Sequence, residues 1–152
     1  MGAKQKRIFM TGYMVTWTTY GTWLQGDKRG FVQDGKTLKG NPKLQRANEE
    51  LQKYNPIVLT KEERQTVLRA ITAESQKIKH TIEAIAVRSN HVHIAARPCK
   101  ETIELIVSRY KNISRIALNR KERIWTRGFD KQFCFTEQDF RQRIEYVERH
   151  NK

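Results

Sequence analysis

TIEAIAVRSNHVHIAAR, residues 81–97, decides the fold because it holds two short β-prone runs with a break between them. The two runs, 81–88 and 91–97, are separated only by Ser89 and Asn90. That spacing suits a tight antiparallel hairpin. The segment therefore predicts two neighbouring antiparallel strands.

The second of these runs carries two histidines in an alternating pattern. Successive side chains of a strand point to opposite faces, so His91 and His93 share one face and Val92 and Ile94 share the other. The apolar pair suits packing against helices, and the imidazoles are then side by side on an open face. Two neutral imidazoles suit a divalent cation, although a His-x-His pair is equally compatible with two solvent-facing histidines.

Five further elements surround the hairpin. A strand is expected at 13–19, a capped helix at 60–79, a second helix at 101–119, a β-prone segment at 122–135 and a last helix from 136 onward. The order is strand, helix, strand, strand, helix, strand, helix. It predicts an α+β, ferredoxin-like split βαβ fold whose mostly antiparallel sheet has its helices on one face.

The chain length suits one domain. With 152 residues, of which 38% are hydrophobic, the sequence predicts a single domain over 1–152. Residues 31–59 form a long insertion, and helical spacing after Pro42 predicts that part of it is helical.

Charge indicates the partner. Thirty Lys plus Arg against sixteen Asp plus Glu give a formal net charge of +14, which favours a nucleic-acid partner. A merely basic surface or a ribosome-associated protein is the alternative. The apolar runs are too short to span a membrane, and Cys99 and Cys134 are typical of reduced thiols. We therefore expect a protein of the prokaryotic cytoplasm.

Two tyrosines lie on helices of different character. Tyr110 falls on the apolar stripe of its helix, so we expect it in the core. Tyr146 lies off the stripe of the last helix, and His150, four residues on, shares its side. Such a tyrosine beside a candidate metal ligand could be a nucleophile or an ordinary surface residue.

Six motifs together carry a resemblance that none carries alone. In chain order they are TWTTYGTWL (16–24), GDKRG (26–30), NHVHI (90–94), RYK (109–111), IWTR (124–127) and YVERHN (146–151). The ordered set resembles the REP-associated tyrosine transposases of the HUH class, which is named for its His-hydrophobic-His pair.

The resemblance implies a specific chemistry. His91 and His93 would match the ligands of a divalent metal ion, Mg or Mn, and Tyr146 would match the nucleophile. The enzyme would nick and rejoin single-stranded or hairpin DNA through a 5′-phosphotyrosine. The third ligand stays open between His150 and Asn151, and the oligomeric state stays open between monomer and homodimer.

Basic and aromatic side chains suggest how DNA would be held. We expect phosphate contacts from Arg29, Lys111, Arg115 and Arg127. Trp17, Trp23 and Trp125 are candidates for stacking on bases, although Trp17 and Trp125 are better candidates for the core. His80 closes a helix, where its polar ring suits the helix dipole, and it is assigned no catalysis.

Two other functions remain open on the sequence alone. One is a catalytically inactive DNA- or RNA-binding domain derived from a transposase. The other is a metal-dependent hydrolytic nuclease in which water replaces Tyr146.

Overall fold

The fold follows the expected order of strands and helices. A computed structural model describes residues 9–22 and 56–151. Its elements are β1 (Gly12–Thr18), α4 (Lys61–Lys77), β2 (Ile82–Val87), β3 (His91–Ala96), α5 (Ile103–Leu118), β4 (Asp130–Cys134) and α6 (Glu137–Arg149). The predicted insertion at 31–59 lies outside the described residues as far as residue 55.

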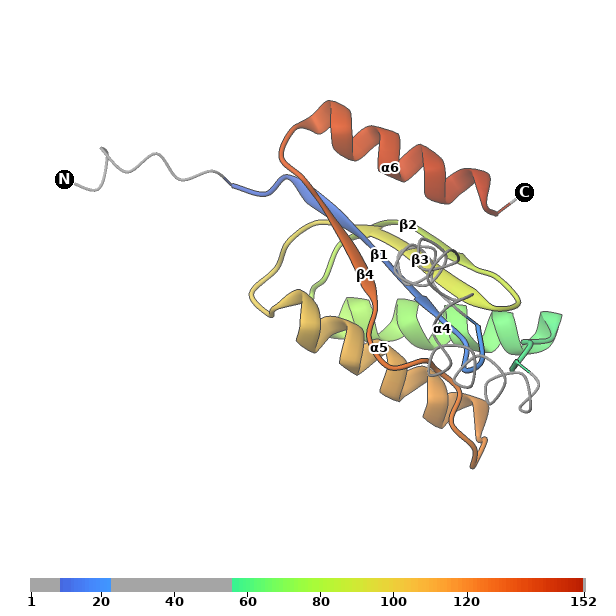
Figure 1. Ribbon diagram of the computed structural model, residues 1–152. Helices are drawn as coiled ribbons and strands as arrows, with labels where there is room; N and C mark the ends of the chain where they lie inside the picture. The colour runs from blue at the N-terminus through green and yellow to red at the C-terminus, as the bar shows by residue number, and fades with distance from the viewer. Residues whose placement is uncertain (1–8, 23–55, 152) are drawn as a thin grey trace, which may run out of the picture.

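The four strands form one sheet in the order β2-β3-β1-β4, and every neighbouring pair is antiparallel. The strand β3 lies between β1 and β2, which α4 connects, so the split βαβ arrangement is confirmed (Figure 1). The hairpin predicted at Ser89-Asn90 joins β2 to β3, and the amide of Arg88 donates to the carbonyl of His91 at 2.8 Å.

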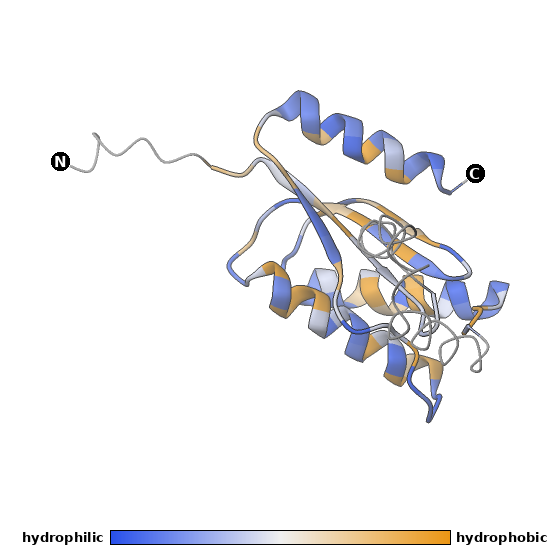
Figure 2. Cartoon of the chain, viewed as in Figure 1, coloured by the Kyte–Doolittle hydropathy of each residue, from blue (hydrophilic) through white to orange (hydrophobic). Residues whose placement is uncertain are grey.

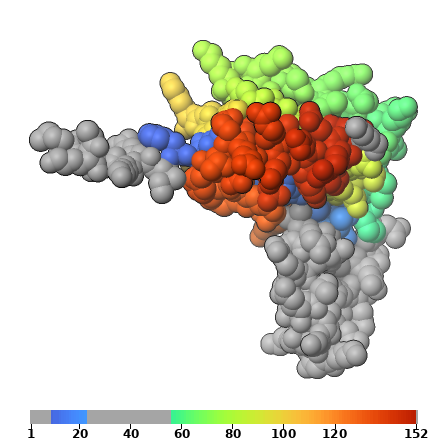
Figure 3. All heavy atoms as spheres, turned by 90° about the horizontal axis from the view of Figure 1, so that it is seen from above, coloured from blue at the N-terminus to red at the C-terminus, as the bar shows by residue number. Residues whose placement is uncertain are grey.

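The expectation that all helices cover one face is wrong. Helices α4 and α5 lie on one face of the sheet, and α6 lies alone on the other (Figure 1). Figure 2 shows that the apolar residues of α6 gather on the side that faces the sheet. Seen from above, α6 lies across the upper surface of the molecule (Figure 3). The face that carries the histidine pair is therefore covered rather than open.

Helices cover both faces of the sheet because β1 carries apolar side chains on both of its faces. Tyr13, Val15 and Trp17 enter the core beneath α4 and α5, whereas Met14 belongs to a second core with Phe140 of α6. A strand buried on both faces needs a cover on each. Gly12 allows α6 to pack closely on β1, because a Cβ at this position would overlap the ring of Phe140.

Local signals for the helix starts are confirmed. The hydroxyl of Thr60 accepts from the amide of Glu63, whose carboxylate accepts in return from the amide of Thr60, which is a complete capping box. Thr136 caps α6 in the same way by accepting from the amide of Asp139 at 3.0 Å. Across residues 9–22 and 56–151, no helix is both long and apolar enough to cross a bilayer.

Candidate active site

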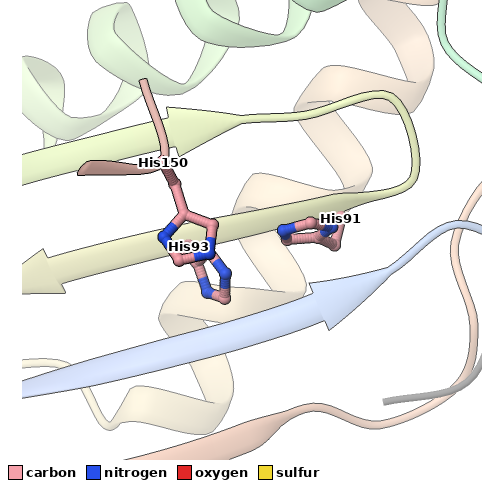
Figure 4. A group of neighbouring side chains, drawn as sticks. All are labelled: His91, His93 and His150. Carbon is pink, nitrogen blue, oxygen red and sulfur yellow. The ribbon is translucent and has the colours of Figure 1, made fainter. Parts of the chain in front are cut away.

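Three histidines meet on the face that α6 covers. His91 and His93 come from β3, and His150 is the C-cap residue of α6. Each offers one ring nitrogen, and these atoms lie within 4.8 Å of one another. Figure 4 shows the three imidazoles gathered over β3. Three nitrogen ligands at this spacing can hold one metal ion.

In His91 and His150, the Nδ1 atom is hydrogen-bonded to an oxygen of the chain, which leaves the Nε2 atom free. The Nδ1 of His91 lies 2.7 Å from the amide oxygen of Asn90, and the Nδ1 of His150 lies 2.9 Å from the carbonyl oxygen of Tyr146. Both oxygens can only accept, so Nδ1 carries the proton in each ring. The Nε2 atoms of both rings then keep their lone pairs for a cation.

The third ring has a hydroxyl partner. His93 is buried, and its Nδ1 lies 2.7 Å from the Oγ1 of Thr16, the residue that faces it across the β1–β3 pair. A hydroxyl can accept the Nδ1 proton, which gives His93 the same free Nε2. The donor set therefore fits a metal ion, with all three rings held by oxygen atoms of the chain.

The surroundings of His91 and His93 keep these two imidazoles neutral. Burial, followed by repulsion from His91, His150 and Arg88, lowers the pKa of His93 to about 3. Burial and the charges of His150 and Arg88 also lower the pKa of His91. Only neutral imidazole binds metal, so both shifts favour the ligand form.

Tyr146 faces the cluster. Its side chain is half-buried, and its ring centroid lies 5.4 Å from that of His93 and 4.5 Å from that of His150. Tyr146 lies off the main apolar stripe of α6. Because α6 covers the histidine face of the sheet, this position brings Tyr146 close to the sheet instead of leaving it at the surface. A tyrosine and a candidate metal centre are thus adjacent.

Of the two candidates for third ligand, the structure brings His150 to the pair and leaves Asn151 outside. The side-chain amide of Asn151 donates to the carbonyl of Ile85 on the edge strand β2, at 2.9 Å. The guanidinium of Arg88 donates to the carbonyl of His150. Both bonds tie the end of α6 to the β2–β3 hairpin and so position His150.

The expected DNA contacts have different environments. Arg29 lies outside the described residues, while Arg115 and Arg127 are exposed. The ammonium of Lys111 donates to the carbonyls of Thr126 and Gly128 at 2.9 and 2.6 Å, and burial lowers its pKa to about 8. Lys111 therefore holds a protein segment in place.

Sequence reasoning missed the setting of His80. The ring is buried, and its two nitrogens lie 2.6 Å from the hydroxyls of Tyr13 and Tyr110. Lys79, with a φ of 56°, turns the chain inward at the end of α4. The expected dipole role is replaced by a buried hydrogen-bonded bridge, which no local spacing could indicate. Trp17 and Trp125 are core residues, as predicted.

Comparison with known proteins gives a family match. The model of the family described as "Transposase IS200 like" matches residues 51–150, well over half of the chain. No curated protein matches.

Solved structures share the fold. One is a REP-associated tyrosine transposase bound to a REP hairpin, with a TM-score of 0.55 at 14% identity, covering 97% of this chain and 70% of that one. Another is a putative transposase from Deinococcus radiodurans, with a TM-score of 0.53 at 13% identity, covering 96% of this chain and 95% of that one. At these identities the likeness establishes the α+β fold.

Proposed function

This chain belongs to the IS200-like transposase family, and from that premise we propose that it nicks and rejoins single-stranded DNA through a covalent bond to Tyr146. The observation that carries the proposal is the position of the Tyr146 ring, 5.4 Å from His93 and 4.5 Å from His150. Nucleophile and metal ligands thus come together although 53 residues separate His93 from Tyr146 along the chain (146 minus 93).

The metal would be held by His91, His93 and His150 through their free Nε2 atoms. When bound, a divalent cation would polarise the scissile phosphate and stabilise the charge that develops on it. Imidazole nitrogen is a better ligand for Mn²⁺ and later transition metals than for Mg²⁺, which prefers oxygen. Of the two ions named by the family resemblance, the three-histidine set favours Mn²⁺.

Tyr146 would act on phosphorus. A bond forms between the phenolic oxygen and phosphorus as the bond from phosphorus to the 3′ oxygen breaks, and the departing oxygen gains a proton. The product is a 5′-phosphotyrosine and a free 3′-hydroxyl. Attack by another strand's 3′-hydroxyl reverses the step, so the reaction needs no nucleotide cofactor.

The DNA would be single-stranded and carry a hairpin. The net charge of +14 supports a polyanionic partner. The fold neighbour solved with a REP hairpin supports the hairpin. Such an enzyme would act in the cytoplasm of a prokaryote, where DNA is directly accessible.

One protomer would be sufficient for catalysis. Tyr146 and His150 lie on α6, which packs on the same chain's sheet through Phe140 and Val147. The three histidines and the tyrosine are therefore present together without a second copy. We propose a site that works within a single chain.

The test is a covalent-adduct assay on the full chain. Purified protein is incubated with Mn²⁺ and labelled single-stranded DNA that carries hairpins from beside its own gene, then run on a denaturing gel. We expect a shifted band that vanishes with chelator and in Tyr146→Phe. Tyr20→Phe is the matched control, because Tyr20 lies under Arg123 and outside the cluster, and it should keep the band.

Other results would overturn the proposal in distinct ways. Cleavage without an adduct, and unchanged in Tyr146→Phe, would make water the nucleophile and the protein a hydrolytic nuclease. Salt-sensitive binding of the same DNA with neither cleavage nor adduct would make it an inactive binding domain.

A further inference from the structure

A second concave site lies away from the histidines, between α5 and the segment 123–129. The pocket has a volume of about 430 Å³. Ligand pockets in proteins typically span about 300 to 1,000 Å³, so it is large enough for one small ligand. Its apolar wall is the partly buried side chain of Phe129, whereas the lining residues Val107 and Ile124 are buried in the core.

The rim of this pocket is strongly basic. Four of its lining side chains are cationic: Lys111, Arg115, Arg123 and Arg127. The acidic lining residue Glu104 has its carboxylate 2.6 Å from the ammonium of Lys131. An apolar wall beneath a basic rim suits a ligand that combines a flat apolar part with a negative charge.

Three of the four rim cations donate hydrogen bonds to neutral groups. Lys111 donates to two backbone carbonyls, Arg115 donates to the amide oxygen of Asn112, and Arg123 donates to the carbonyl of Trp125. Within residues 9–22 and 56–151, none of the four rim cations forms an ion pair with a carboxylate. Their positive charge is therefore available to an anion.

Hydrogen bonds hold the pocket in shape. Lys111 fixes the segment to α5 through the carbonyls of Thr126 and Gly128. The indole nitrogen of Trp125 donates to the hydroxyl of Ser114 at 3.1 Å, one turn further along the helix. A site that is formed in advance loses less entropy when its ligand binds.

The pocket connects to the histidine cluster through the end of β1. The amide of Thr126, a lining residue, donates to the carbonyl of Thr18 at 2.9 Å, and Thr18 faces His91 across the sheet. Two steps of interstrand spacing put Thr126 roughly 10 Å from His91. Since the pocket borders α5 and the histidines face α6, a DNA strand that reaches both passes around the sheet.

We propose that this pocket binds one unpaired nucleotide of the DNA strand that the enzyme cuts. The base lies against Phe129, and its phosphate lies at Arg115 and Arg127. The side chains of Ser108 and Asn112 stand at the same pocket and can read the base edge. The inference rests on the proposed function for its choice of DNA.

The first test fills the pocket. Ser108 is an exposed lining residue of α5, so Ser108→Trp blocks the cavity without removing a charge or a core side chain. Ala117→Trp is the matched control, since Ala117 is exposed on the same helix and does not line the pocket. Affinity for a fluorescein-labelled, 20-nucleotide mixed-sequence single strand is measured by anisotropy with chelator present.

Ser108→Trp should weaken binding about tenfold, as expected for loss of one bound base, and Ala117→Trp should stay within about twofold of the original. Equal affinities of the two variants would overturn the proposal. Arg127→Gln supplies a second arm that leaves the fold intact, because Arg127 is exposed. It should weaken binding and reduce the salt dependence by about one phosphate contact.

The second test locates the nucleotide. Single abasic sites are moved along a strand that forms the adduct. One abasic position should weaken binding by the original protein and have no further effect on Ser108→Trp. An abasic effect that is the same in both proteins would place the base elsewhere.

The two proposals fail separately. Because binding is measured with chelator, absence of an adduct in the original protein would reject the role of Tyr146 and leave the pocket comparison intact. Conversely, Ala117→Trp should form the adduct as the original protein does, because Ala117 does not line the pocket. Normal adduct formation with equal DNA affinity in both tryptophan variants would reject the pocket alone.

Discussion

Thr16 Oγ1 lies 2.7 Å from the Nδ1 of His93, between two residues that face each other across β1 and β3. The hydroxyl fixes the orientation of a buried ring whose Nε2 would face the proposed metal. Asn90 and the carbonyl of Tyr146 do the same for the other two histidines. Metal binding at the proposed site would thus depend on oxygen atoms that do not touch the metal.

Replacing Thr16 by valine should weaken metal binding by about 10- to 100-fold, because the ring of His93 loses its oriented partner. Thr16→Ser keeps the hydroxyl and should bind nearly as well as the original. Isothermal titration with Mn²⁺ measures both variants without reference to activity. If valine and serine bind Mn²⁺ equally well, the hydroxyl does not orient His93.

Replacing His150 by glutamine should change which metal is preferred. The substitution exchanges a nitrogen ligand for an amide oxygen, and Mg²⁺ prefers oxygen. We expect the ratio of Mn²⁺ to Mg²⁺ affinity to fall by about tenfold or more, as for a lost or altered ligand contact. Asn151→Ala is the comparison, since its amide bonds to Ile85, and it should leave this ratio unchanged. An unchanged ratio in His150→Gln would remove His150 from the ligand set.

The metal-free protein should lose stability as the pH falls below about 6.5. Burial and neighbouring positive charge lower the pKa of His93 from 6.5 to about 3. Between these two pH values, His93 is protonated in the unfolded chain and neutral in the folded chain. This depressed pKa leaves stability intact above the unfolded value and erodes it as the pH drops toward 3. For His93 alone, the free energy of unfolding should fall by about 2 kcal/mol between about pH 7 and pH 5.

Urea unfolding with chelator present, at those two pH values, measures this loss. His93→Gln lacks the titrating ring and should show a correspondingly smaller dependence on pH. A slope that is the same with and without the His93 ring would contradict the assignment of a depressed pKa to that residue.

Two inactive variants should not restore each other. A mixture of His93→Ala and Tyr146→Phe contains an intact tyrosine on one chain and an intact histidine pair on the other. Because α6 packs on its own sheet, through Phe140 and Val147, neither chain regains a complete site. Adduct formation by the mixture should match that of the separate variants. Recovery of the adduct would show that α6 is exchanged between two copies.

Much of the fold was predictable because its local signals are strong. The alternation of Val92 and Ile94 with the histidines assigns the faces of β3, and the cap at Thr60 fixes the start of α4. The side of the sheet that α6 covers was not predictable. The apolar stripe through Phe140 says only that α6 is buried on one side, whereas the choice of face depends on Met14 and Gly12, far away in the sequence.

The sequence predicts the residue types of the candidate site. It does not predict which residue joins the histidine pair as the third candidate ligand, nor which residues position the rings. Spacing on a helix could not separate His150 from Asn151, because both lie where the helix ends and the carbonyl of Ile85 decides where the amide goes. The bonds of Lys111 to the carbonyls of Thr126 and Gly128 depend on a tertiary contact that the sequence does not indicate, and its phosphate contact stays a prediction. Thr16 carried no signal until β1 was paired with β3.

The division of the site between β3 and α6 also sets an order during synthesis. The ribosome makes the histidine pair first and reaches Tyr146 only after α5 and β4 have been added. A nascent chain that has already folded its hairpin would therefore hold two of the proposed metal ligands without the proposed nucleophile. Strand breakage through Tyr146 would have to wait until the last helix has been made and has docked on the sheet.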